Sequence, residues 1–139
     1  MVLETPGERH TTQRDAIARV IREAPGPLAV KEIHERARRR SGKLGIATVY
    51  RTLKLLVEAG QVHAVTLADG QTRYESANLG HHHHFHCRRC DRVYDLPDCP
   101  LPEGGHVSVP TGYTVEDHEV TLIGLCPKCG GNGDTGKKA

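Results

Sequence analysis

The sequence predicts a protein of the α+β class, in which three helices and a hairpin precede a domain made mostly of short strands. Apolar residues recur at helical spacing in three segments before residue 60, and then at the period of a strand between residues 62 and 75. In the second half, a stretch rich in Pro and Gly at 97–105 excludes a regular helix. Two Cys-x-x-Cys pairs in the same half predict a metal site that helps to hold it together.

Three helices are expected in the N-terminal half. The first follows Thr11 or Thr12, either of which can cap it, and the segment 25–27 (Pro-Gly-Pro) ends it. The second covers about 30–40. The third runs from about 47 to 59, and its apolar stripe consists of Val49, Leu53, Leu56 and Val57.

A two-stranded hairpin is expected directly after the third helix. Residues 62–67 alternate, Asp69-Gly70 is a turn signal, and residues 72–75 form the returning strand. Three helices followed by a hairpin are the outline of a winged helix-turn-helix. This predicts a DNA-binding domain over residues 1–76.

The remainder of the chain is expected to form a second domain. Residues 77–81 act as a hinge, residues 82–129 form the domain, and the polar, Gly-rich residues 130–139 are expected to be disordered. Its strands are placed at 82–87, 92–96 and 113–125.

Length and composition limit what the chain can be. The 139 residues suffice for one or two small domains, and aromatic residues make up only 4%. No apolar run is long enough for a membrane span, and no signal peptide is visible, so a cytoplasmic protein without membrane association is expected.

Charge is distributed unevenly along the chain. Residues 1–60 carry 12 Lys and Arg against 7 Asp and Glu, whereas residues 80–139 carry 6 Lys and Arg against 8 Asp and Glu. The basic half suits nucleic acid, although a solvated helix face would explain the run of Arg at 36–40 equally well.

The cysteines indicate a structural zinc site. Two residues between thiols allow a tight turn to direct both sulfurs at one point, and two such turns supply a tetrahedral set of thiolates. A disulfide and a redox-active pair are the alternatives. The predicted ligands are Cys87, Cys90, Cys126 and Cys129.

The third helix is predicted to be the recognition helix of the DNA-binding domain. Its first turns carry Thr48, Tyr50 and Arg51, whose side chains can contact base edges in the major groove. Alternatively, Tyr50 packs between helices. Arg14 and the hairpin residue Arg73 are candidate phosphate contacts.

A run of histidines precedes the first cysteine pair. Side chains on a strand alternate between two faces, so His82, His84 and His86 are expected on one face and His81 and His83 on the other. One strand can therefore supply ligands to two metal sites on opposite sides.

The chain resembles the ferric uptake regulator (Fur) family of metal-dependent repressors. The matching motifs are Thr-Thr-Gln-Arg at 11–14, Gly-Ile-Ala-Thr-Val-Tyr-Arg-Thr-Leu at 45–53, Arg-Tyr-Glu at 73–75, the run 81–90, and the segment 117–129. The resemblance implies a winged helix, a hinge and an α/β dimerisation domain. It also implies a homodimer that binds double-stranded operator DNA when a regulatory metal is present.

The resemblance also implies ligand sets and DNA contacts. Structural zinc would be held by the four paired cysteines. DNA contacts would be Tyr50 and Arg51, together with Arg9 and Arg14. The regulatory ligands would be Glu75, His82, His84 and Asp95, and an additional site would use His81, His83 and His118.

Two departures from the family pattern matter for these sites. Pro27 stands near the position where the family often has a histidine, so His34 or water could complete the regulatory site. The helix of the dimerisation domain is replaced by residues 97–112, which leaves Cys99, Glu103 and His106 as candidates for a ligand that the helix would carry. Dimerisation is then expected to rest mainly on strand pairing.

Glu75 and Asp95 beside two histidines favour Fe²⁺ or Mn²⁺ as the regulatory metal, although such a site also takes Zn²⁺ in vitro. Neither an enzyme nor a small-molecule substrate is expected. The alternatives are a redox or peroxide sensor of the same family, a metal buffer or chaperone, and a metal enzyme.

Overall fold

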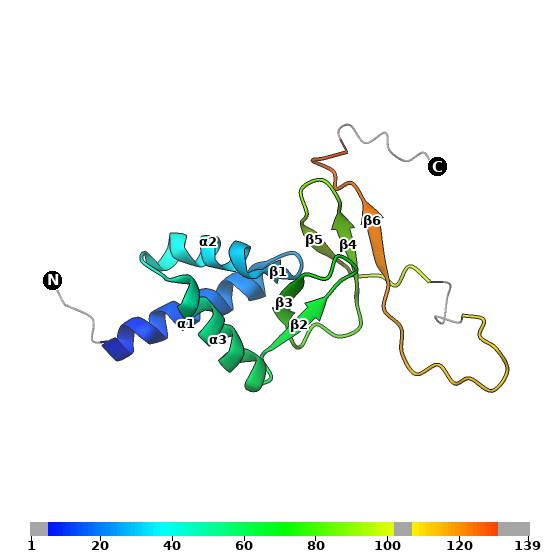
Figure 1. Ribbon diagram of the computed structural model, residues 1–139, viewed down its shortest axis with the longest axis horizontal. Helices are drawn as coiled ribbons and strands as arrows, with labels where there is room; N and C mark the ends of the chain where they lie inside the picture. The colour runs from blue at the N-terminus through cyan, green and yellow to red at the C-terminus, as the bar shows by residue number, and fades with distance from the viewer. Residues whose placement is uncertain (1–5, 102–106, 131–139) are drawn as a thin grey trace. The chain divides into compact units, whose positions relative to one another are not determined.

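The computed structural model describes residues 6–101 and 107–130, with side chains in the first helix from Thr12 onward. The chain divides into two compact units, Met1–Gly80 and His81–Ala139. The first unit contains all the helices of the described residues, and the second contains a small sheet (Figure 1).

The N-terminal unit consists of three helices and a three-stranded sheet. Its sheet is antiparallel with the strand order β1-β3-β2. The elements are α1 (Pro6–Glu23), β1 (Leu28–Ala29), α2 (Val30–Ser41), α3 (Ile46–Glu58), β2 (Val62–Thr66) and β3 (Thr72–Ser76). Three helices followed by a β-hairpin form the predicted winged helix-turn-helix.

One hydrophobic core holds this unit together. The helical period of the sequence places one face of each helix inside: Ile17 of α1, Ile33 of α2 and Val49 of α3 are fully buried. Leu53 and Leu56 extend the buried face of α3, as the apolar stripe predicts, whereas Val57 remains 39% exposed.

Two boundaries depart from the sequence-based expectation. Helix α1 begins at Pro6, so neither Thr11 nor Thr12 is its cap. A proline is tolerated in the first turn because no intrahelical hydrogen bond needs its missing N–H. Helix α2 ends at Ser41, one residue beyond the expected end at about 40, and Gly42 follows it with a φ of +80° and an N–H that donates to the carbonyl of Arg38 at 3.0 Å.

The hairpin is formed as predicted, and it gains a third strand. The β2–β3 register runs from Val62 opposite Ser76 to Thr66 opposite Thr72, and Gly70 takes a φ of +79° in the turn. Strand β1 pairs with β3 at Leu28 and Ala29. Two residues are too few for a periodic pattern, so β1 could not be predicted from local periodicity.

The C-terminal unit is built on a second three-stranded sheet. It consists of β4 (His83–Cys87), β5 (Val93–Leu96) and β6 (Thr121–Gly124), in the order β5-β4-β6. Strands β4 and β5 are antiparallel, whereas β6 runs parallel to β4, which the long connection between β5 and β6 allows.

The last strand is much shorter than the expected 113–125. Strand β6 begins at Thr121, which pairs with His84, and the preceding carbonyl of Val120 accepts the N–H of His84 at 3.1 Å. Residues 113–120 are not part of the strand, because the parallel register with β4 begins only at Thr121. Of residues 97–112, where the sequence predicts that no dimerisation-domain helix forms, the structure describes 97–101 and 107–112, and these contain no helix.

Two further expectations concern the C-terminal tail and the absence of a membrane span. The predicted tail lies outside the described residues apart from Gly130. Among the helices of 6–101, none combines the length and apolar character that crossing a membrane requires.

Candidate metal centres and nucleic-acid interface

The four paired cysteines converge at one end of the second sheet. Cys87 ends β4 and Cys126 follows β6, and both are buried. The Sγ atoms of Cys90 and Cys126 are 3.9 Å apart, and all four sulfurs lie within 4.8 Å of one another. Tetrahedral zinc with Zn–S bonds of about 2.3 Å places sulfurs about 3.8 Å apart, so the set fits a structural zinc ion.

Both cysteine turns are built in the same way. In the first, the N–H of Asp91 donates to the carbonyl of Cys87 at 2.9 Å, and in the second the N–H of Gly130 donates to that of Cys126 at 2.8 Å. Asp91 takes a φ of +64°, the left-handed conformation that closes the first turn. Arg89 then joins the two turns, because its guanidinium donates to the carbonyl of Cys129 at 3.0 Å.

The thiols of this cluster differ in acidity. The backbone N–H of Cys90 lowers the pKa of the Cys87 thiol to about 5. The backbone N–H of Cys129 likewise lowers the pKa of Cys126. Burial, followed by the side chain of Cys126, raises the pKa of Cys129 to about 12. The protein backbone therefore stabilises some thiolates, but a cation is needed to stabilise all four together.

A second set of metal-binding side chains lies across β4 and β5. His84 pairs with Asp95 in the strand register, and their Nε2 and Oδ1 atoms are 3.7 Å apart. His82 Nε2 lies at the same distance from that oxygen, and the two imidazole rings are 4.9 Å apart. All three side chains are half-buried. The structure thus brings together three of the four predicted regulatory ligands within one unit.

The fourth predicted regulatory ligand, Glu75, belongs to the other unit. It lies in β3, near the end of the N-terminal unit, and is buried. Its participation stays a prediction. His34, considered as a substitute for the residue missing at Pro27, is engaged elsewhere, because its Nε2 is 2.6 Å from the carbonyl oxygen of Leu44.

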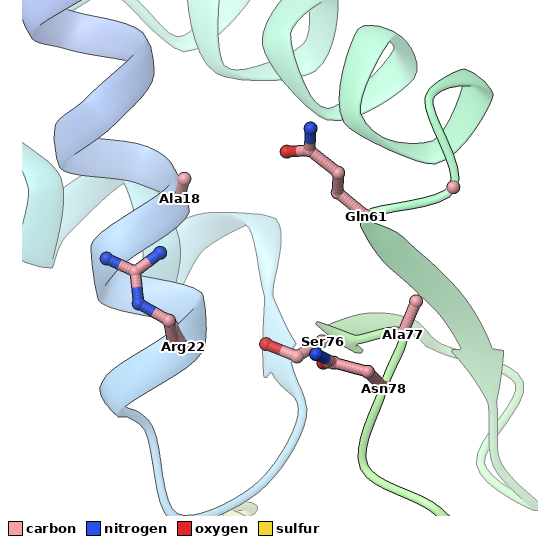
Figure 2. A pocket seen from close by; sticks show the side chains of 7 residues that line it. Ala18, Arg22, Gln61, Ser76, Ala77 and Asn78 are labelled. Carbon is pink, nitrogen blue, oxygen red and sulfur yellow. The ribbon is translucent and has the colours of Figure 1, made fainter.

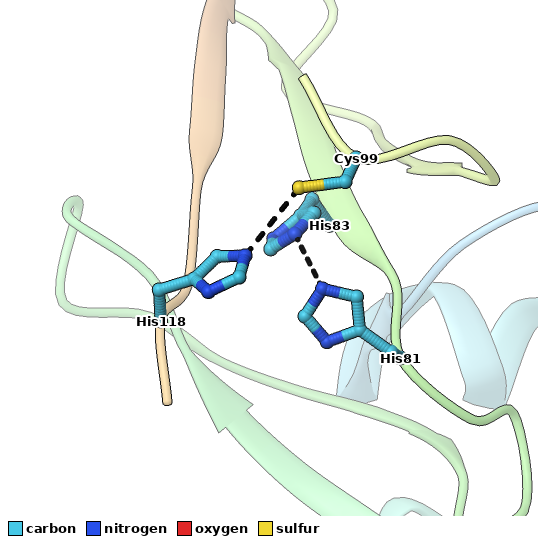
Figure 3. A group of neighbouring side chains, drawn as sticks. All are labelled: His81, His83, Cys99 and His118. Carbon is cyan, nitrogen blue, oxygen red and sulfur yellow. Dashed lines mark hydrogen bonds between the residues drawn. The ribbon is translucent and has the colours of Figure 1, made fainter. Parts of the chain in front are cut away.

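The three histidines of the predicted additional site, His81, His83 and His118, lie close together (Figure 3). His81 Nε2 lies 3.0 Å from His83 Nε2, and the ring of His118 stacks on that of His83 at 4.9 Å. Burial lowers the pKa of His83, and the imidazoles of His81 and His118 lower it further, which favours the neutral form that binds metals. The three residues of the predicted additional site therefore lie together.

His86, in β4, has a partner that the alternation argument did not predict. Alternation predicts that it shares a face with His82 and His84, and its Nε2 lies 2.7 Å from the carboxylate of Asp91 in the first cysteine turn. Sequence reasoning also gave Cys99 no definite role, and the structure places its thiol 3.4 Å from Nε2 of His118. No local motif marks this contact, because 19 residues separate the two.

The recognition helix presents its predicted side chains outward. Tyr50 is 56% exposed, so the alternative that it packs between helices is wrong. Arg51 is also exposed, and its guanidinium donates to the hydroxyl of Thr48 at 3.1 Å. Arg14 of α1 is exposed as well, whereas the side chain of Arg9 lies outside the described residues.

The proposed phosphate contact at Arg73 is wrong. Its side chain is 1% exposed, and the guanidinium donates to Asp69 and to Gln71, at 3.1 Å each. Arg73 therefore stabilises the turn of the hairpin. In the basic run of α2, Arg39 pairs with Glu35 and Arg40 pairs with Glu23, so much of that charge is neutralised by neighbouring carboxylates.

A hollow of about 300 Å³ lies in the N-terminal unit between α1 and the ends of β2 and β3 (Figure 2). Its lining holds no His, Cys, Asp or Glu, so it offers no metal site. The lining residues are Ala18, Arg22, Gly60, Gln61, Ser76, Ala77 and Asn78.

A winged helix joined to a sheet with clustered thiol and imidazole ligands defines a metal-binding transcription regulator. Comparison with known sequences makes the assignment specific. The chain belongs to the Ferric uptake regulator family, whose profile matches residues 5–123.

Individual relatives match along nearly the whole chain. A ferric uptake regulation protein of Synechococcus elongatus is 33% identical over 131 residues, which are 91% of this chain and 89% of the relative. A zinc uptake regulation protein of Mycobacterium tuberculosis is 29% identical over 128 residues, 91% of this chain and 98% of the relative. A solved structure described as a zinc-bound manganese uptake regulator matches with a TM-score of 0.68 and 27% identity, covering 90% of this chain and 91% of the other.

Proposed function

We propose that this chain is a metal-responsive repressor that binds operator DNA as a homodimer when its regulatory metal is bound. The observation that carries the proposal is the set His82, His84 and Asp95, which begins directly after the winged-helix unit. Relatives named for iron and zinc uptake and a manganese regulator of similar structure support a regulatory role for metal. We expect the protein to act in the cytoplasm, where its DNA lies, and to have no catalytic activity.

Glu75 gives the regulatory set a route to the DNA-binding unit. It lies in β3 of that unit, and only six residues separate it from His82. A metal bound by Glu75 together with His82, His84 and Asp95 would restrain the angle between the units. Repression follows if the metal binds the DNA-competent arrangement more tightly than the others.

Two nitrogens and two carboxylates suit Fe²⁺ or Mn²⁺. Zn²⁺ binds such a set in vitro as well, because affinity for N and O ligands rises toward the end of the first transition row. The paired cysteines would hold a separate zinc ion whose role is structural.

The edge of the second sheet supports a homodimer. Strand β6 is an edge strand among the described elements, and it exposes Leu122 and Ile123 by 43% and 59%. Unpaired backbone groups beside exposed apolar side chains favour pairing with another chain. A symmetric DNA site would then contact one α3 from each protomer.

The test is operator binding by the wild-type protein and by His84→Ala, titrated with Mn²⁺ and Fe²⁺ at controlled free concentrations. His84→Ala is expected to keep the cysteine-bound zinc and the dimer but to lose metal-induced DNA binding. His63→Ala serves as the control, because His63 is an exposed histidine of β2 that belongs to none of the ligand clusters of the described residues. If metal tightens DNA binding by His84→Ala as much as by the wild type, the switch lies at another site. If metal does not tighten DNA binding by the wild type or by His84→Ala, although both proteins bind the metal, the chain is a metal buffer.

A further inference from the structure

Cys99 lies in the imidazole cluster on the opposite side of β4 from the regulatory set. Figure 3 shows the thiol directed toward His118, beside His83 and His81. Each of the four residues offers one ligand atom, and these atoms lie within 4.8 Å of one another. They come from four places in the sequence: the start of the C-terminal unit, β4, the segment after β5 and the segment before β6.

The separations resemble those around a tetrahedral zinc ion. Zn–N bonds of about 2.0 Å and Zn–S bonds of about 2.3 Å place two nitrogens about 3.3 Å apart, and a nitrogen and a sulfur about 3.5 Å apart. The two nitrogens of His81 and His83 are 3.0 Å apart, and the Cys99 sulfur is 3.4 Å from His118 Nε2. Small outward movements of these side chains would admit an ion.

The exposure of the cluster suits an exchangeable ion. His83 is buried beneath the cluster, whereas His81 and Cys99 are exposed. An ion can therefore enter without unfolding the sheet. In contrast, two of the four ligands in the cysteine cluster are buried.

We propose that Cys99 is the fourth ligand of this cluster, and that the resulting His₃Cys site binds Zn²⁺ in preference to Mn²⁺ or Fe²⁺. Thiolate is a soft ligand that favours Zn²⁺, whereas a carboxylate at the same place would favour harder ions. The chain then has a second zinc site besides the cysteine cluster. This inference depends on the proposed function in one respect, which is that structural zinc fills the cysteine cluster.

The same contacts also permit a cluster held by hydrogen bonds alone. The N–H of Val120 donates to Nδ1 of His83 at 3.1 Å, so the neutral ring carries its proton on Nε2, next to His81. To bind a metal through Nε2, the ring must move that proton to Nδ1 and give up the bond from Val120. Metal binding is therefore expected to shift the amide resonance of Val120, which hydrogen bonding alone leaves in place.

The decisive experiment uses Co²⁺ as a spectroscopic substitute for zinc. Protein whose cysteine cluster is already filled with zinc is titrated with Co²⁺, and the thiolate-to-cobalt charge-transfer absorption is recorded. The wild type is expected to gain this absorption, and Cys99→Ser is expected to lose it. His84→Ala is the matched control and should keep it, because the regulatory set contains no thiolate. Absorption that persists in Cys99→Ser, or never develops in the wild type, would overturn the proposal.

Metal preference provides an independent measurement. In a His84→Ala background, which disables the regulatory set, Zn²⁺ and Mn²⁺ compete for the remaining site. Replacing Cys99 with Asp is expected to lower the preference for Zn²⁺ by about 10-fold or more, since a hard ligand replaces a soft one. An unchanged preference would exclude Cys99 as a ligand. Neither measurement involves DNA, so failure here is distinguishable from failure of the proposed repressor function.

Discussion

Four thiolates that converge on one point repel one another, and this repulsion makes the cysteine cluster dependent on a cation. The pKa of Cys87 is lowered to about 5, whereas that of Cys129 is raised to about 12. Without a metal, one part of the cluster therefore favours thiolate while another stays protonated. A divalent ion removes this conflict, and its binding free energy then contributes directly to folding.

The first prediction concerns the dependence of the second unit on zinc. Cys126→Ser removes a buried ligand and is expected to abolish zinc retention and unfold the C-terminal unit. Apparent binding free energies of structural zinc are about 10–16 kcal/mol in small peptides, which exceeds what a small sheet can replace. Native mass spectrometry gives the zinc content, and circular dichroism follows the fold. Cys99→Ser, at a thiol outside the cluster, should retain the structural zinc. Unchanged zinc content in Cys126→Ser would refute the assignment.

The second prediction concerns Arg51 on the exposed face of α3. If its guanidinium contacts a guanine, Arg51→Ala should weaken operator binding by about 1–3 kcal/mol and random DNA much less. Lys54, which is exposed on the same helix, provides the control, since Lys54→Ala removes the same charge one turn away. Fluorescence anisotropy with both DNAs measures the difference. An equal loss for operator and random DNA would make Arg51 a phosphate contact.

At the scale of single elements, α3 has to satisfy two demands at once. Its inner face, with Val49, Leu53 and Leu56, fixes the helix in the core, while the outer face carries Tyr50 and Arg51. The rigidity of the inner face therefore determines how well the outer face is positioned. Substitutions on the two faces should accordingly have different effects on stability.

A pair of leucines on α3 tests this division. Leu53 is 1% exposed and Leu55 is 50% exposed. Leu53→Ala should destabilise the N-terminal unit by about 2–5 kcal/mol because it leaves a cavity in the core. Leu55→Ala should cost no more than about 0.5 kcal/mol. Urea denaturation followed by helical ellipticity gives both values, and equal effects would contradict the packing described.

These elements also show where sequence reasoning succeeds and where it fails. Helices α2 and α3 and the hairpin follow from local periodicity and turn chemistry, and the cysteine spacing alone predicted the cluster. The length of β6 did not follow, because a strand ends where its partner ends. The same holds for β1, which exists only as a partner of β3. Local patterns report the propensity of a segment, whereas pairing depends on distant segments.

Side-chain partners were the least predictable feature of the sites. Alternation correctly separated His83 from His84 onto two faces of β4, but it could not show that His86 bonds Asp91. Arg73 was a candidate phosphate contact and is instead buried against Asp69. In both cases a nearby carboxylate determines the result, and its position depends on the conformation of a turn.

At the scale of the whole molecule, charge and metal sites are divided between the two units. The basic excess lies in residues 1–60, where the exposed face of α3 is found, and the clustered ligands His82, His84 and Asp95 lie in the other unit. A metal can therefore influence DNA binding only by coupling the units or by promoting dimerisation. Thermodynamic linkage provides a way to measure that coupling.

The last prediction uses the reciprocity of linked equilibria. If Mn²⁺ tightens operator binding by a given factor, saturating operator DNA must tighten Mn²⁺ binding by the same factor, because both paths end in the same ternary complex. Couplings of about 1–3 kcal/mol are typical, which corresponds to about 5–150-fold. We expect the wild-type dimer to show this gain in metal affinity with operator, and much less of it with random DNA. His84→Ala should show no such gain, because the metal can no longer join His82, Asp95 and Glu75.

Calorimetric metal titrations with and without DNA, at a protein concentration that keeps the dimer intact, provide the measurement. If DNA leaves the metal affinity unchanged under those conditions, metal acts by assembling the dimer rather than by orienting its DNA-binding units.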